Sequence, residues 1–321
     1  MTCCLDTVIM ISILLLLLLC TVIFARWRRN HVVVVPEGRA VLITGCDSGF
    51  GNQLARRLLD MGFTVFATCL FPDGEGAQSL LKYFSPGKVK VIRLDVTNDT
   101  EIAEVKQYVQ NNLPAKGLWG IVSNAGISTW GPFDWHTIEA YRRVVDINLL
   151  GSIRTTLAFA PLIKKSKGRM VYMSSITAYV SMINGIYSMT KAAIERFCDS
   201  LRLEMMRNGV KVCLIEPGNY ALATNIQPLK SADDIWDSLA ADVQESYSKE
   251  YLENVNQSVT AALSKGSSKG HEVVDAIVHA LISDAPKPRY LVASLAEKIS
   301  VYLSLWLPTS VFDKILSRAS V

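Results

Sequence analysis

Short apolar runs alternate with longer amphipathic stretches from residue 39 onward, and this alternation constrains the fold more than any other feature. The runs are nearly continuously apolar, which is typical of parallel strands that helices cover on both faces. Strands are expected at residues 39–44, 63–69, 89–96, 118–124, 169–175, 210–217 and 288–293, and helices at 50–61, 101–112, 138–164 and 188–208. Because no repeat or long linker interrupts the pattern, residues 31–295 are predicted to form one α/β domain with a doubly wound, Rossmann-type parallel sheet.

The first 30 residues differ from the rest in composition. Residues 8–25 are apolar apart from Ser12 and Thr21, and as a helix they would reach about 27 Å, close to the thickness of a thin bilayer. A cleaved secretory signal is the alternative, but no Lys or Arg precedes the run and no small-x-small site closes it. Residues 1–30 are therefore predicted to be a membrane anchor. The basic residues all follow the run, which places the remaining chain on the cytosolic side.

The C-terminal segment, residues 296–321, is also apolar and aromatic over 299–316, with a break at Pro308. Two interpretations stay open: a second membrane contact, or a helix that packs on the core.

Charge and cysteine usage exclude two classes of function. The 321-residue chain has a net charge of +4, and its only tight basic run is 26–29, so it lacks the basic stripe that nucleic acid attracts. Its seven cysteines show no paired metal-ligand spacing. Neither a nucleic-acid partner nor a metal site is predicted, and the cysteines are expected to be reduced and mostly buried.

The segment TGCDSGFG (44–51) connects the first expected strand to the first expected helix. Glycines at 45, 49 and 51 permit a tight turn and let a pyrophosphate approach the helix N-terminus, where free N–H groups and the helix dipole favour an anion. The spacing is not that of the Gly-x-Gly-x-x-Gly fingerprint, but its place between a strand and a helix indicates a dinucleotide site.

The choice between NAD and NADP depends on the end of the second strand. An acidic residue there would bind the ribose 2′-hydroxyl, but Cys69 and Leu70 occupy this place. No Arg or Lys stands nearby to hold a 2′-phosphate, which favours NAD without excluding NADP. Asp95, at the end of the third strand, either contacts the adenine or caps a turn.

Tyr187 and Lys191 stand four residues apart in YSMTK (187–191) and would share one face of a helix. This spacing is common by chance, so its weight comes from the motifs around it. These are, in order, TGCDSGFG (44–51), Asp95-Val96, SNAG (123–126), Asn148, Ser175, YSMTK and EPGNY (216–220). With this order and spacing, residues 39–225 resemble the short-chain dehydrogenase/reductase family. TGCDSGFG, KGLWGIVSNAGIS and IEPGNY are similar to the subfamily of retinol, 17β-hydroxysteroid and D-3-hydroxybutyrate dehydrogenases.

The resemblance implies an NAD(P)-dependent alcohol dehydrogenase. Tyr187 would exchange the alcohol proton, helped by the ammonium of Lys191 and the positive nicotinamide, both of which should lower the phenol pKa from its usual value near 10. Ser175 would bind the substrate oxygen, and Asn148 would hold a water that links Lys191 to solvent. The implied cofactor-binding residues are Gly45, Asp47, Ser48, Gly49, Phe50, Gly51, Cys69, Asp95, Val96, Asn124, Ala125, Gly126, Tyr187, Lys191, Pro217 and Gly218.

Two positions depart from the family pattern. Ser123 stands where members usually have Asn, and Thr224 follows Gly218 by six residues rather than four or fewer. A small effect on local geometry is expected at the first, and the second leaves a contact of Thr224 to the carboxamide open.

The expected substrate pocket contains residues after Gly126, residues 176–186 and the 220–260 segment. Trp130, Phe133 and Trp135 would line it or pack in a lid, together with Tyr179, Met182 and Ile183 from the second stretch. An apolar pocket and a membrane anchor favour a lipophilic steroid or retinoid alcohol and an endoplasmic-reticulum membrane, with a homo-oligomer implied by the family.

Two alternatives stay open. D-3-hydroxybutyrate would need a cation in the pocket, for which Arg142, Arg143 and Lys230 are candidates, and would place the protein in mitochondria. A membrane-tethered binding protein that keeps the fold without the chemistry is the third interpretation.

Overall fold

The computed structural model describes residues 10, 13–14, 16–18, 20–21, 33–83, 87–227 and 230–319. Most of the predicted anchor, including much of residues 8–25, lies outside these residues; those that are described there are helical and exposed. Within the described part of the chain, no helix has both the length and the apolar character needed to span a bilayer.

Seven parallel strands form one sheet in the order β3-β2-β1-β4-β5-β6-β7. Their bounds are β1 Ala40–Thr44, β2 Thr64–Cys69, β3 Val89–Arg93, β4 Leu118–Ser123, β5 Arg169–Met173, β6 Lys211–Pro217 and β7 Arg289–Val292. Each lies within a predicted strand, and the predicted α/β domain with a parallel Rossmann-type sheet is confirmed. The strand order reverses between β1 and β4, and ligands of such sheets bind beyond the carboxyl ends of the strands at this point.

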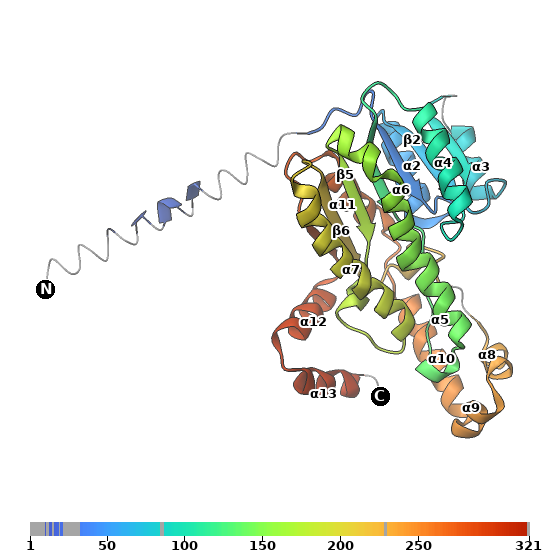
Figure 1. Ribbon diagram of the computed structural model, residues 1–321. Helices are drawn as coiled ribbons and strands as arrows, with labels where there is room; N and C mark the ends of the chain where they lie inside the picture. Colours follow the sequence, from blue (N-terminus) through green and yellow to red (C-terminus); the bar gives the residue numbers. More distant parts are fainter. Residues whose placement is uncertain are drawn as a thin grey trace, which may run out of the picture.

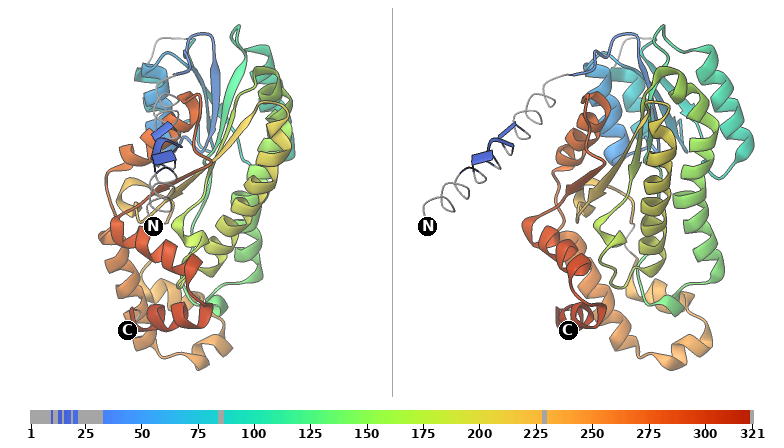
Figure 2. Two further views of the ribbon diagram at one scale, coloured as in Figure 1. Left: turned by 90° about the vertical axis from the view of Figure 1, so that its left-hand side faces the viewer. Right: turned by 60° about the vertical axis from the view of Figure 1, so that its left-hand side comes forward.

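Helices cover both faces of the sheet (Figures 1 and 2). One apolar cluster joins the sheet to α2, α3 and α11, and a second joins it to α4, α6 and α7. Alternate residues of β1 enter opposite clusters, Val41 and Ile43 the first and Ala40 and Leu42 the second, as the period of a strand requires. The helices are α2 Gly49–Asp60, α3 Glu75–Tyr83, α4 Asp99–Asn111, α5 Ile138–Val145, α6 Gly151–Ser166, α7 Gly185–Met206 and α11 Gly270–Ile282.

The long helix predicted over 138–164 is interrupted. A π-helical turn, η2 (Asp146–Leu150), separates α5 from α6 and carries Asn148. Such turns often occur at functional sites, because the extra residue re-aims the side chains around it. The helices α3 and α11 were not predicted. Cys46, Cys69, Cys198 and Cys213 are buried free thiols, as expected.

A smaller group of helices lies beyond the carboxyl edge of the sheet (Figure 1). It comprises α8 Ala232–Ser238, α9 Ala241–Ser246 and α10 Lys249–Ser264, with α12 Leu295–Trp306 and α13 Thr309–Ala319 after β7. The break between α12 and α13 falls at Pro308, as the sequence predicts.

Candidate active site

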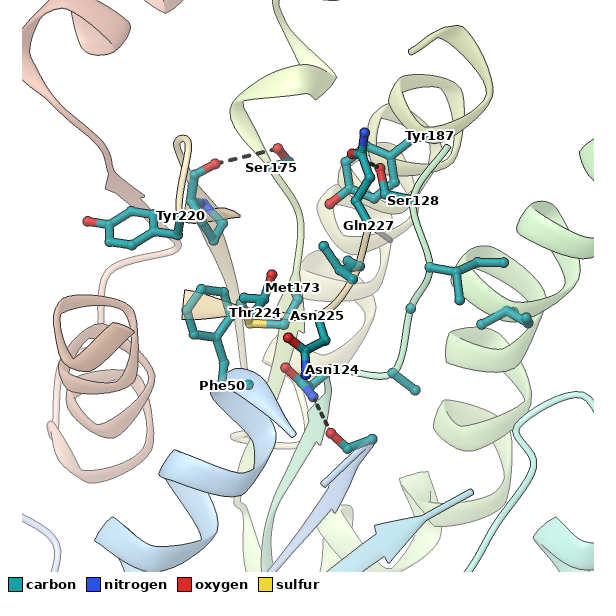
Figure 3. A pocket seen from close by; sticks show the side chains of 18 of the residues that line it. Phe50, Asn124, Ser128, Met173, Ser175, Tyr187, Tyr220, Thr224, Asn225 and Gln227 are labelled. Atoms are coloured by element: carbon teal, nitrogen blue, oxygen red, sulfur yellow. Dashed lines mark hydrogen bonds between the residues drawn. The ribbon is translucent and has the colours of Figure 1, made fainter. Parts of the chain in front are cut away.

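A cavity of about 580 Å³ opens at the carboxyl ends of the strands. All the predicted site residues line it except Gly51, Cys69 and Asn148. They come from the turn after β1 and the ends of β3 to β6, together with the first turns of α7, so the sheet brings together residues that lie as far apart in sequence as Gly45 and Gly218. Figure 3 shows Asn124 near one end of this cavity, and Ser175 and Tyr187 farther along it.

The glycine turn leaves no room for side chains. A Cβ on Gly51 would lie 2.3 Å from the carbonyl oxygen of Gly45, and Gly45 itself has a φ of 71°. The Asn124 amide donates hydrogen bonds to the carbonyl oxygens of Thr44 and Gly45 at 2.8 and 3.0 Å, which fixes the turn against β4. The side chain of Ser48 does not cap α2, and Ser48, Gly49 and Phe50 at this end of the helix line the cavity. This turn therefore fits a pyrophosphate.

Two carboxylates lie on the cavity wall, Asp47 in the glycine turn after β1 and Asp95 after the end of β3. Asp47 accepts hydrogen bonds from the N–H groups of Leu70 and Phe71 at 3.0 and 2.8 Å. Asp95 accepts from the N–H and hydroxyl of Thr97 at 2.9 and 2.7 Å, so it does cap a turn, while it also lines the cavity. Cys69 is fully buried, and burial, followed by the charge of Asp47, raises the pKa of its thiol to about 12.

Tyr187 and Lys191 both point into the cavity from α7. The Lys191 ammonium lies 5.3 Å from the centre of the Tyr187 ring and donates to the carbonyl oxygen of Met173 at 2.8 Å. Ser175 begins the short helix η3 (Ile176–Ala178), accepts from the N–H of Thr177 at 3.2 Å and donates to the carbonyl oxygen of Pro217 at 3.4 Å. Phenol, ammonium and hydroxyl thus lie at one end of the cavity.

The pKa of Tyr187 moves in the direction opposite to the one expected from its neighbour. Burial raises it to about 12, and hydrogen bonding with Ser175 offsets only part of this shift. Burial also lowers the pKa of Lys191 to about 8, since the residue is only 4% exposed. The protein alone therefore holds Tyr187 as a neutral phenol, and Lys191 does not suffice to make it acidic.

Asn148 holds two segments together instead of facing the cavity. Its amide pairs with the N–H and carbonyl of Ile127, both at 2.9 Å, and donates to the Thr190 hydroxyl at 3.1 Å. The side chain is 2% exposed. It thus fixes the segment after Gly126 against the start of α7.

The two positions that depart from the family pattern fit the site. Thr224 lines the cavity despite the longer loop. Ser123 is buried and donates to the Ser152 hydroxyl at 2.8 Å, which in turn donates to the carbonyl oxygen of Asn148.

The aromatic side chains expected in the pocket lie elsewhere. Trp135 packs with Ile235, Leu239 and Leu252 in a separate cluster that Trp130 also joins, and Phe133 is 76% exposed. Tyr179, Met182 and Ile183 do not line the cavity either. Trp130 and Trp135 lie in loops near the site, so the sequence alone could not tell whether they pack against α8 and α10 or contact a ligand.

Other residues that line the cavity were not predicted individually. They are Leu70, Phe71, Leu94, Ile127, Ser128, Ile147, Met173, Ser174, Ile176, Thr177, Asn184, Asn219 to Ala221, Asn225 to Gln227, and Leu263. Leu70 and Phe71 could have been found, because they directly follow the second strand. Leu263, near the end of α10, has no local sequence signal.

A charged cluster lies behind Ser175. Glu195 on α7 and Glu216 on β6 are 3% and 4% exposed, and Arg289 on β7 donates to both, at 2.7 Å to Glu216. The Tyr179 hydroxyl lies between the two carboxylates, at 2.6 and 3.1 Å. Burial and the charge of Glu195 raise the pKa of Glu216.

The charged cluster is connected to the two segments that carry Ser175 and Pro217. Ser174 donates to Glu195 at 2.7 Å, and Glu216 directly precedes Pro217. The cluster therefore braces the two segments that carry Ser175 and Pro217.

A parallel sheet with a glycine turn at its switch point, and a phenol and an ammonium opposite that turn, defines a nicotinamide-dependent dehydrogenase. The family model described as short chain dehydrogenase matches residues 39–234, and the chain belongs to this family. It is a dehydrogenase, and its cofactor is a nicotinamide dinucleotide.

Curated relatives cover nearly all of the chain. Short-chain dehydrogenase/reductase family 9C member 7 of Mus musculus is 39% identical over 91% of this chain and 94% of its own. D-beta-hydroxybutyrate dehydrogenase, mitochondrial, of Rattus norvegicus is 37% identical over 87% and 84%. 17-beta-hydroxysteroid dehydrogenase type 6 of Bos taurus is 38% identical over 92% and 93%.

Solved structures share the fold. A short-chain dehydrogenase from Streptomyces avermitilis has a TM-score of 0.65 and 22% identity over 89% of this chain and 99% of its own. One from Burkholderia phymatum in complex with NAD has a TM-score of 0.65 and 19% identity over 84% and 93%.

Proposed function

We propose that this protein is a membrane-anchored, NAD-dependent dehydrogenase that interconverts a lipophilic alcohol of the steroid or retinoid class and its carbonyl compound. The observation that carries the proposal is the character of the cavity that Tyr187 lines. Ile127, Ile176, Ile226 and Leu263 contribute to its wall, and Lys191 is the sole Arg or Lys among the described residues that line it. Such a wall favours an apolar substrate over an anionic one.

Within this proposal, Tyr187 exchanges the proton of the substrate oxygen and Ser175 donates a hydrogen bond to it. Lys191 binds the ribose next to the nicotinamide, and the bound dinucleotide supplies the hydride chemistry and a positive charge beside the phenol. Because the protein alone raises the pKa of Tyr187 to about 12, that charge is what allows the phenol to act as a base near neutral pH. The proposed role of Asn148 is to hold Ile127 and α7 in place, since its amide is already paired.

The alternative substrate, D-3-hydroxybutyrate, is supported by the relatives that carry this activity in their names. The three cations considered for its carboxylate do not line the cavity: Arg142 and Arg143 are exposed on α5, and Lys230 is exposed before α8. Neutral donors remain, because Ser128 and Gln227 line the cavity and are joined by a hydrogen bond of 2.9 Å.

A substrate panel tests the proposal. The full chain in detergent micelles is supplied with NAD and with an androstanediol, estradiol, retinol or D-3-hydroxybutyrate, and NADH formation is followed. We expect kcat/KM for a steroid or retinol to exceed that for D-3-hydroxybutyrate by at least about a hundredfold, because a carboxylate would enter the apolar wall without a cation. Faster oxidation of D-3-hydroxybutyrate would overturn the substrate class, and nucleotide binding without turnover would favour a binding protein.

Membrane association has support from both ends of the chain. Besides the apolar run 8–25, α12 exposes Leu295, Ile299, Tyr302 and Trp306, which share one helical face, and Trp306 is 84% exposed. Aromatic residues such as Tyr302 and Trp306 suit a bilayer interface. Glu297, on the opposite side of α12, accepts from the N–H of Asn219 at 2.7 Å, and Asn219 lines the cavity. The helix therefore packs beside the cavity with its apolar face turned outward, where a bilayer could contact it.

We expect the full chain to stay with membranes through an alkaline carbonate wash, and a chain without residues 1–30 to be released by it. The shortened chain should still bind vesicles through α12, and Ile299→Glu with Trp306→Glu should weaken that binding at least about tenfold. Leu81→Glu, on the exposed side of α3, serves as the control and should leave binding unchanged. Release of the full chain by the wash would contradict the anchor.

The location in the cell and the oligomeric state stay proposals. The Leu-rich N-terminal run, which is unlike an Arg- and Ser-rich transit peptide, favours the endoplasmic-reticulum membrane with a cytosolic domain, and the rat relative named as mitochondrial keeps the mitochondrion as the alternative. Exposed Leu157, Leu203 and Met206 on α6 and α7 favour a homo-oligomer.

A further inference from the structure

The acid expected at the end of the second strand is absent from the sequence, but a carboxylate does occupy that place in the structure. Asp47 belongs to the glycine turn, and its two oxygens accept the N–H groups of Leu70 and Phe71. These are the first two residues after β2, which ends at Cys69. A carboxylate at the carboxyl end of this strand is what binds the ribose 2′-hydroxyl in dinucleotide-binding folds.

The Asp47 carboxylate is firmly placed. Its own carbonyl oxygen lies so close to α3 that a Cβ on Gly76 would be 1.8 Å from it. Asn52 ties the two segments together by donating to the carbonyl oxygens of Cys46 and Gly76 at 3.1 and 2.8 Å. The turn, the end of β2 and the start of α3 therefore hold the carboxylate at one position on the cavity wall.

The hydrogen-bonding capacity of Asp47 is not exhausted. An ionised carboxylate has about four acceptor sites, and the two backbone N–H groups use two of them. The half-buried side chain lines the cavity beside Leu70 and Phe71. The remaining sites can accept a hydroxyl group.

A 2′-phosphate in the same place, unlike a hydroxyl, would be repelled by Asp47. A 2′-phosphate brings nearly two negative charges next to the Asp47 carboxylate. Within the described lining the single cation is Lys191, and its ammonium is bonded to Met173 at the far end of the cavity. Nothing on the described wall near Asp47 would compensate the two anions.

We propose that Asp47 selects NAD over NADP by accepting the adenosine 2′-hydroxyl of NAD and repelling the 2′-phosphate of NADP. The acid that members of such folds carry at the end of the second strand is thus supplied here from the glycine turn. This inference rests on the NAD preference of the proposed function and assigns that preference to one side chain.

The test measures binding, without substrate. The full chain in detergent micelles is titrated with NAD and with NADP by calorimetry, and the ratio of the two dissociation constants is compared among variants. In the unmodified protein we expect NAD to bind at least about tenfold tighter. Asp47→Asn and Asp47→Ser should lower this ratio at least about tenfold, by weakening NAD and tightening NADP.

Two further variants separate charge from structure. Phe71 is 67% exposed and lines the cavity, so Phe71→Arg leaves the core intact and places a cation beside Asp47. It should tighten NADP binding about tenfold and thereby lower the preference for NAD, because the new cation can pair with the 2′-phosphate. Asp73→Asn removes an exposed carboxylate from the same loop without touching the cavity wall, and the ratio should not change.

The outcomes are distinct. If the Asp47 variants weaken both nucleotides by the same factor, Asp47 only supports the loop and the inference is overturned. It is overturned equally if NADP binds better than NAD to the unmodified protein. Failure of the unmodified protein to bind either nucleotide would instead refute the proposed function itself.

Discussion

Tyr187→Phe is expected to lower kcat for alcohol oxidation by about 10²–10⁴-fold while the dissociation constant for NAD changes less than about twofold. The phenyl ring keeps its place on α7 and beside the Lys191 ammonium, so the cavity retains its shape. The lost oxygen is the group that would exchange the substrate proton, and the Ser175 hydroxyl cannot replace it because it is weakly acidic. Stopped-flow turnover and calorimetric NAD binding on the same preparation check the two halves of this result.

The pH dependence gives a second test of Tyr187. Oxidation needs the phenolate form of Tyr187. Because burial raises the pKa of this phenol, the phenolate fraction is still rising between pH 6 and 8. Lys191, with a pKa lowered to about 8, loses its proton above that pH and with it the charge that supports the phenolate. The kcat/KM for oxidation should therefore increase from pH 6 to about 8 and level off above it.

In Tyr187→Phe this dependence should disappear. Tyr141→Phe is the matched control, since its hydroxyl bonds the Phe133 carbonyl outside the cavity, and it should retain full activity. Full activity of Tyr187→Phe would refute its proposed role as the proton-exchanging group.

Arg289→Met is expected to lower the free energy of unfolding by about 3 kcal/mol. Arg289 donates to Glu195 and Glu216, and these carboxylates are 3% and 4% exposed, so its removal leaves two buried negative charges without their cation. Arg289 is itself 30% exposed, which lets water take over part of its role and keeps the estimate at the lower end of the range for buried pairs. Urea unfolding followed by circular dichroism measures the loss.

The stability loss in Arg289→Met should depend on pH, and the raised pKa of Glu216 gives the sign of this dependence. A carboxyl whose pKa is higher in the folded than in the unfolded state stabilises the fold when protonated, and this contribution is lost as pH rises through the folded value. Without Arg289 the pKa of Glu216 should rise further. The variant should therefore lose more stability at pH 8 than at pH 5.

Two further variants test whether the lost charge of Arg289 causes the loss of stability. Adding Glu216→Gln to Arg289→Met removes one of the two uncompensated carboxylates and should restore at least about 1 kcal/mol. Arg142→Met, which breaks only an exposed pair with Glu139, should change stability by less than about 0.5 kcal/mol. An equal loss at both pH values, with no rescue by Glu216→Gln, would show that packing rather than charge is responsible.

The sequence by itself determined the seven strands, the helices α2, α4 and α7 and the glycine turn, because strand and helix periodicities and glycine requirements act over a few neighbouring residues. The order and spacing of its motifs, through their resemblance to the short-chain dehydrogenase/reductase family, also assigned Gly45, Asn124, Ser175, Tyr187 and Lys191 to one predicted site. Substrate class is the part that local patterns could not reach.

Only the tertiary structure decided how the remaining side chains are used. It placed Trp135 against α8 and α10 instead of in the cavity, brought Arg289 to Glu195, which lies 94 residues away in sequence, and set Asp47 against the end of β2. It also showed that, in the protein alone, burial outweighs Lys191 in setting the pKa of Tyr187. These outcomes depend on burial and on contacts between distant segments, and desolvation is a property of the assembled fold that no stretch of residues carries alone.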